Sequence, residues 1–109
     1  MAFNVKITDK FAESYIAASE YLTRCDESGR AASRLVDEVE GTMHLLAEFP
    51  RMYAVREDES RKSGIEVRAV SVGRYLLFYQ VLEDVVYLHT LRHKLADPDA
   101  IDWSAITGD

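Results

Sequence analysis

Three consecutive apolar segments in the second half of the chain constrain the fold most strongly: 64–70 (GIEVRAV), 72–82 (VGRYLLFYQVL) and 85–98 (VVYLHTLRHKLADP). They are rich in β-branched and aromatic residues, which favour strands. The strands are separated at 72–73 and at 83–84, and these connections are too short for a crossover helix, so neighbouring strands must run antiparallel. The middle segment is too apolar to leave one face in water. The sequence therefore predicts a three-stranded meander whose central strand is covered on both faces.

The N-terminal half predicts one short strand and two helices. Residues 3–7 alternate apolar and polar side chains, as a half-buried strand does. Thr8 offers an N-cap to a first helix, whose apolar side chains recur every three or four residues over 11–22. A polar turn separates it from a second helix, which has the same periodicity over 32–46 and ends before Pro50. Two helices joined by so short a turn form an antiparallel hairpin.

The remaining segments complete an α+β prediction. Residues 51–63 show little periodicity and are interpreted as an exposed connection with one short strand at 52–55. An Asp-Pro pair at 97–98 predicts a short C-terminal helix through Trp103. The expected order is β-α-α-β-β-β, with the helical hairpin packed on one face of a small, mainly antiparallel sheet. At this length we expect a single domain, residues 1–109.

Composition indicates a cytoplasmic protein and argues against a dedicated nucleic-acid binder. The formal net charge is −6, although residues 50–94 carry 8 Lys/Arg against 6 Asp/Glu. No apolar run approaches the roughly 20 residues that span a bilayer, and the N-terminus lacks the order of a secretory signal. The lone Cys25 cannot form an internal disulfide, which fits a reducing compartment.

Positive charge gathers where the predicted strands end. Arginine side chains there could hold phosphate or carboxylate groups bidentately. The alternative is that these cations are solvated strand ends, paired with acidic neighbours such as Glu66. His93 lies between two cations, where it could donate a proton or contact a phosphate, whereas His89 alternates with apolar residues and is expected to pack. The candidate catalytic residues, if the protein is a metal-independent nuclease, are Arg68, Arg74, His93 and Lys94. No spacing resembles a metal or cofactor site.

Several phrases of this sequence resemble the RelE/ParE toxins of bacterial type II toxin–antitoxin systems. They are Leu46–Pro50 (LAEFP) at the end of the second helix, the strand phrase 72–81 (VGRYLLFYQV) and the closing phrase 93–98 (HKLADP). Taken in this order and spacing, the phrases extend the resemblance over most of residues 3–101. In the closing phrase, Lys94 and Leu95 replace the Gly-Arg that is usual in the family. The resemblance implies the same α+β fold and a role as a toxin.

The resemblance leaves two mechanisms open. RelE-type members cleave mRNA on the ribosome with several lysines and arginines, but here Val67, Ala69 and Leu76 fall where those cations are expected, and no tyrosine follows Tyr87. ParE-type members poison DNA gyrase through a protein contact, and the phrases are more similar to that branch. The resemblance therefore implies a ParE-like toxin that a cognate antitoxin neutralises, laid as a helix or an added strand along an apolar surface.

Two alternatives stay open. The protein is a ribosome-dependent mRNA endoribonuclease that uses the four candidate residues, or it is a degenerate toxin that retains only antitoxin binding. The implied partners are accordingly an antitoxin with either DNA gyrase or the ribosome and its mRNA. Neither a cofactor nor a membrane enters these hypotheses.

Overall fold

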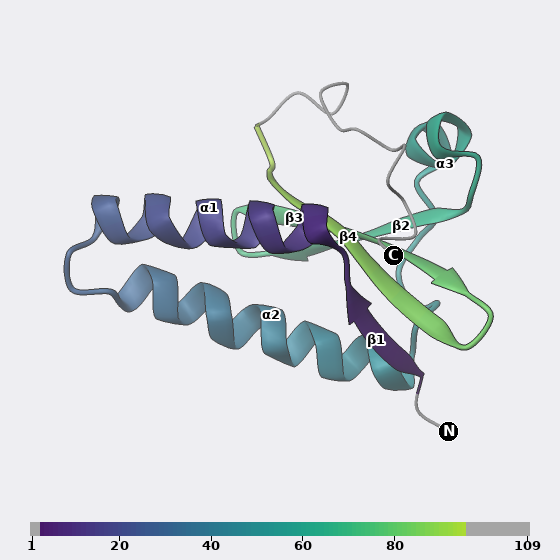
Figure 1. Cartoon of the computed structure of the whole chain (residues 1–109), viewed down its shortest axis with the longest axis horizontal. Helices are drawn as coiled ribbons and strands as arrows, with labels where there is room; N and C mark the ends of the chain where they lie inside the picture. The colour runs from purple at the N-terminus through teal and green to yellow at the C-terminus, as the bar shows by residue number, and fades with distance from the viewer. Residues whose placement is uncertain (1–2, 96–109) are drawn as a thin grey trace.

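The computed structural model describes residues 3–95 and confirms an α+β fold (Figure 1). Within those residues the elements, in chain order, are β1 (Asn4–Ile7), α1 (Asp9–Cys25), α2 (Arg30–Glu48), α3 (Glu57–Ser63), β2 (Val67–Val72), β3 (Tyr75–Leu82) and β4 (Val85–His93). The predicted C-terminal helix lies outside the described residues. In the described part of the chain, no helix is both long and apolar enough to cross a membrane.

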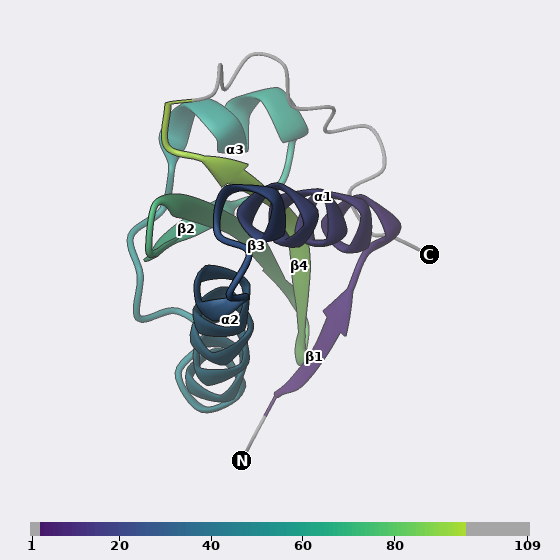
Figure 2. The same ribbon diagram turned by 90° about the vertical axis from the view of Figure 1, so that its left-hand side faces the viewer.

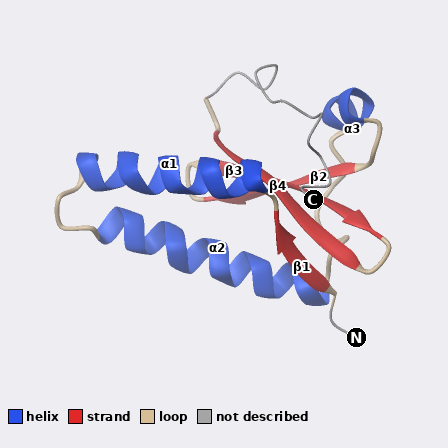
Figure 3. Ribbon diagram, in the orientation of Figure 1, coloured by secondary structure: helices blue, strands red, loops and turns tan. Residues whose placement is uncertain are grey.

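The strands form one sheet in the order β1-β4-β3-β2 (Figure 3). The predicted meander is present, because β2 pairs antiparallel with β3 and β3 antiparallel with β4. β1 joins the far side of β4 in parallel, which is possible because the helical hairpin carries the chain across the sheet. Gly73 and Glu83, at φ 59° and 55°, provide the left-handed residues of the two tight turns.

Thr8 connects the start of α1 to the centre of the sheet. Its hydroxyl oxygen accepts the backbone N–H of Phe11 at 3.1 Å, as the N-cap prediction requires. The same hydroxyl lies 3.0 Å from the carbonyl oxygen of Leu88 and 2.9 Å from that of His89, to which it donates. Thr8 is buried, so this one side chain fixes α1 against a β-bulge of β4.

The main core lies between the helical hairpin and one face of the sheet (Figure 2). Phe11, Val39 and Leu46 of the helices meet Leu77 and Tyr79 of β3 there. A smaller apolar cluster occupies the opposite face and is built on Val67 and Phe78, with Ile65, Ala69 and Leu76 packed against it. Because successive side chains of a strand point to opposite faces, β3 contributes to both clusters. The prediction that both of its faces are covered is confirmed.

The interpretation of residues 51–63 as an exposed connection was wrong in its second half, which forms α3. This helix has no apolar stripe, so periodicity could not reveal it. Acidic side chains fill its first turn and basic ones its last, and both complement the helix dipole. Gly64, at φ 79°, ends it, and the Ser60 hydroxyl accepts the N–H of Val67 at 2.7 Å, which joins α3 to β2. Instead of a strand at 52–55, one isolated bridge pairs Val55 with Arg68.

Neighbouring leucines of α2 provide a test of this packing. Leu46 is fully buried in the main core, whereas Leu45 is 45% exposed. We expect Leu46→Ala to lower the free energy of unfolding by about 2 to 5 kcal/mol, since it leaves a cavity. Leu45→Ala should change it by less than about 0.5 kcal/mol. Urea denaturation measures both, and equal losses would contradict the packing described for α2.

Candidate functional site

The structure brings three of the four candidate residues together and leaves the fourth apart. Arg74 lies in the turn between β2 and β3, and His93 ends β4 directly opposite Tyr75. The backbone N–H of Lys94 donates to the carbonyl of Arg74 at 3.0 Å. Arg68 stands near the other end of β2, and the four residue-to-residue steps from Arg68 to Val72 span about 13 Å of strand.

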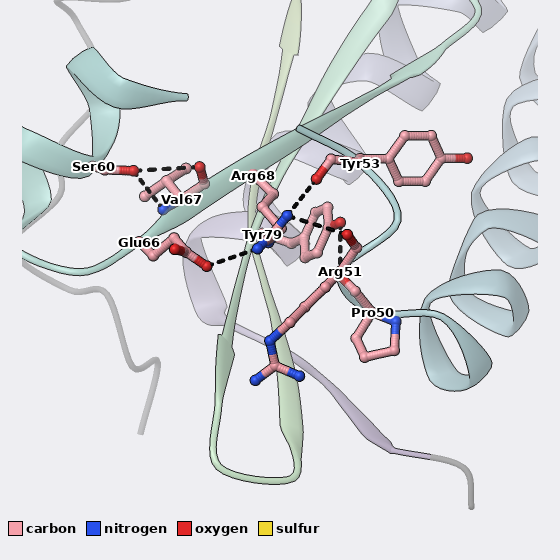
Figure 4. Close-up of polar contacts among 8 residues, drawn as sticks. All are labelled: Pro50, Arg51, Tyr53, Ser60, Glu66, Val67, Arg68 and Tyr79. Atoms are coloured by element: carbon pink, nitrogen blue, oxygen red, sulfur yellow. Dashed lines mark hydrogen bonds and ion pairs between the residues drawn. The ribbon is translucent and has the colours of Figure 1, made fainter. Parts of the chain in front are cut away.

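Arg68 is engaged in holding the fold (Figure 4). Its guanidinium donates to the carbonyl oxygens of Arg51 at 3.2 Å and Tyr53 at 2.6 Å, and to the Glu66 carboxylate at 2.9 Å. Its side chain is only 13% exposed. Beside it, the hydroxyl of Tyr79 donates to the carbonyl of Pro50 at 2.9 Å. These bonds attach the segment that follows α2 to the sheet, and the pairing of Arg68 with Glu66 is confirmed.

The sheet face opposite the helices carries apolar side chains where the nuclease resemblance expects cations. Val67, Ala69 and Leu76 all belong to its small apolar cluster. Positive charge is present on this face: the Arg56 guanidinium lies 5.8 Å from the centre of the Phe78 ring and 3.5 Å from the Glu59 carboxylate. Because this guanidinium already contacts an aromatic ring and a carboxylate, little of its positive charge is available to bind a phosphate. The face as described therefore lacks the expected lysines and arginine.

A pocket of about 530 Å³ opens at the tip of the helical hairpin, and we name it the tip pocket. It lies between the last turn of α1, the first half of α2, the β2–β3 turn and the end of β4. Its lining residues are Tyr21, Leu22, Cys25, Ala31, Arg34, Leu35, Glu38, Val72, Gly73, Arg74, Tyr75 and His93. It therefore contains two candidate residues, Arg74 and His93, and sequence reasoning missed Arg34 and Glu38.

Polar groups around the tip pocket are held in defined positions. His93 accepts the backbone N–H of Leu95 on Nδ1 at 3.2 Å, and its ring meets that of Tyr75 edge-on, with centroids 5.4 Å apart. Because Nδ1 accepts, the neutral imidazole carries its proton on Nε2 and is a donor there. A hydrogen bond with the Cys25 thiol raises the pKa of Tyr21, and burial raises the pKa of Tyr75. Tyr21 and Tyr75 are therefore held in the neutral, protonated form, in which a phenol can donate a hydrogen bond.

The other two histidines stand apart from the tip pocket. His89 is buried in β4, as expected for a packing residue, and His44 is exposed on α2. Among residues 3–95 no cluster of three or more histidine, cysteine or acidic side chains is placed to hold a metal ion.

The alkaline stability of the protein should report on the buried Tyr79. Burial raises the pKa of Tyr79 to about 12, although the nearby Arg68 charge lowers it. The folded protein then keeps a proton that the unfolded chain releases near pH 10, so the stability is present below about pH 10 and lost as pH rises toward about 12. We expect a loss of about 1.4 kcal/mol per pH unit in that window.

Tyr79→Phe is the matched comparison, because it removes the phenol and leaves Tyr15 and Tyr75 unchanged. The variant loses the hydrogen bond to Pro50, worth about 1 kcal/mol, at all pH values. Between about pH 10 and 12 its stability should fall less steeply than that of the parent. Parallel curves in urea denaturation across this range would contradict the buried, hydrogen-bonded phenol.

A comparison with known families agrees with the fold and with the sequence resemblance. No curated protein matches the chain. A family model described as the ParE toxin of the type II toxin–antitoxin system parDE matches residues 5–98, which include every described strand and helix except the first residue of β1. Because this match spans most of the sequence, the chain belongs to the ParE toxin family of type II toxin–antitoxin systems.

Proposed function

We propose that this toxin arrests growth by a protein contact with DNA gyrase and that a cognate antitoxin neutralises it. The observation that carries the proposal is that apolar Val67, Ala69 and Leu76 lie where RNA cleavage would need cations, while Arg68 is held apart from the other candidate residues. Such cleavage requires several positive groups around one phosphate and a group that moves the 2′-hydroxyl proton. Arg68 is bound to two carbonyls and a carboxylate, well away from Arg74 and Lys94.

An exposed apolar patch at the end of α2 supports action through a protein contact. Leu45, Phe49 and Met52 are 45%, 56% and 53% exposed. They lie close along the chain, because the N–H of Phe49 donates to the carbonyl of Leu45 and that of Met52 to the carbonyl of Phe49. Clustered apolar side chains of this kind are typical of protein interaction sites. We assign this α2-end patch to the contact with gyrase.

Purified toxin should inhibit DNA supercoiling by gyrase. We expect the double variant Leu45→Ser/Phe49→Ser to need about tenfold more toxin for half inhibition, since two apolar contacts are removed. Ile16→Ser is the matched control: it replaces an apolar residue that is 60% exposed on α1, and it should inhibit as the parent does. Inhibition that is equal for all three proteins would show that the α2-end patch does not contact gyrase.

Induced expression in a bacterial host separates the proposed function from the two alternatives. Growth arrest with relaxed plasmid or DNA breaks, and with a defined mRNA left intact, is the expected result. Arrest with cleaved mRNA would instead support the nuclease at Arg74, His93 and Lys94, whose proximity favours that alternative. Cleavage should then be lost in Arg74→Ala/Lys94→Ala. Absence of arrest would identify a degenerate toxin.

A further inference from the structure

The tip pocket combines an apolar floor with a cationic rim. Leu22, Leu35 and Val72 provide apolar walls from α1, α2 and β2. Its volume of about 530 Å³ falls in the range of pockets that enclose small ligands, and it holds one or two side chains of a peptide. A ligand that fills it must therefore present an apolar body.

Charge at the pocket favours an anion. Arg34 and Arg74 come from different elements, and both line the cavity. They are exposed, so their guanidinium groups are accessible to a bidentate carboxylate. Among the lining residues Glu38 alone is acidic, and its carboxylate packs against Gly73, 3.3 Å from where a β-carbon would lie. The remaining positive excess is small, which suits a singly charged carboxylate better than a doubly charged phosphate.

We propose that the tip pocket binds an acidic segment of the antitoxin. An apolar side chain of that segment enters between α1, α2 and the β2–β3 turn, and an adjacent carboxylate pairs with Arg34 and Arg74. The Nε2–H of His93 donates a further hydrogen bond to the bound segment. This inference rests on the proposed function only for the identity of the partner, since an antitoxin is the partner that the family implies.

Cys25 allows ligand binding in the tip pocket to be measured directly. It is the single cysteine of the chain, it is exposed, and it lines the pocket. A peptide that carries a cysteamine disulfide exchanges with its thiol to form a mixed disulfide and releases cysteamine. In the presence of 2-mercaptoethanol, which competes for the thiol of Cys25, the yield of mixed disulfide reports the non-covalent affinity of the peptide for the tip pocket. Mass spectrometry of the intact protein measures that yield.

Three probe peptides separate the two parts of the recognition, each a tripeptide extended by a C-terminal cysteine whose sulfur is joined to cysteamine in a disulfide. Asp-Leu-Asp has the apolar side chain and the carboxylates, Asn-Leu-Asn lacks the charge, and Asp-Gly-Asp lacks the apolar side chain. We expect Asp-Leu-Asp to be captured about tenfold better than either of the others. Equal capture of all three, or an advantage that inorganic phosphate alone abolishes, would overturn the assignment to an acidic peptide.

Matched variants test the two arginines. Arg34→Gln/Arg74→Gln should remove the preference for Asp-Leu-Asp over Asn-Leu-Asn. The control Arg51→Gln/Arg61→Gln removes the same charge away from the pocket, where Arg61 pairs with Asp58, and should keep the preference. A preference that survives in Arg34→Gln/Arg74→Gln would show that these arginines do not recognise the carboxylate.

The complex with the antitoxin identifies the occupant. Cys25 should react with the thiol reagent DTNB about tenfold more slowly in the complex than in the free toxin. An unchanged rate would overturn the assignment of the pocket to the antitoxin. Peptide capture and DTNB reactivity both measure Cys25 directly, so their results do not depend on whether the toxin inhibits gyrase. A failure of the tip-pocket proposal can therefore be told apart from a failure of the gyrase proposal.

Discussion

The fold depends on the need to cover both faces of β3. β3 carries apolar side chains on both of its faces, so neither face can be left exposed to water. Leu77 and Tyr79 therefore require the helical hairpin on one face. Phe78 requires a second cluster on the other face. β3 therefore lies between β2 and β4, and the two antiparallel pairings follow. The same pairing carries the β2–β3 turn and the end of β4 to one end of the sheet, where the tip pocket forms.

Burial also decides what an arginine can do in this molecule. Arg68 projects from β2 on the helix-facing side, beside the buried Tyr79, where a guanidinium needs nearby acceptors. The carbonyls of Arg51 and Tyr53 supply them, and so hold the chain that leaves α2 against the sheet. A cation that satisfies backbone carbonyls in this way is not available to a substrate. Arg34 and Arg74 are exposed and stay free for recognition.

The helical hairpin and the meander could be predicted because each element buries one regular set of apolar side chains. Phe11 and Leu46 belong to helical stripes, and both reach the main core. α3 could not be predicted in this way, because it has seven residues and no apolar stripe. Its dipole-complementing charges, the glycine that ends it and the contact of Ser60 with β2 stabilise it instead. A family resemblance carried by short phrases added the toxin role, which periodicity does not contain.

From the sequence alone, the helical hairpin, the antiparallel meander and the gathering of cations near strand ends were determined, because these depend on spacing along a local segment of backbone. Tertiary structure decided which cations meet. Arg34 of α2 and Arg74 of the β2–β3 turn share the tip pocket only because the hairpin packs on the sheet at that place. Arg68, on the same strand that leads to Arg74, is removed from the group by the carbonyls that it binds. Contacts between distant segments depend on register and packing, and no local pattern in the sequence encodes them.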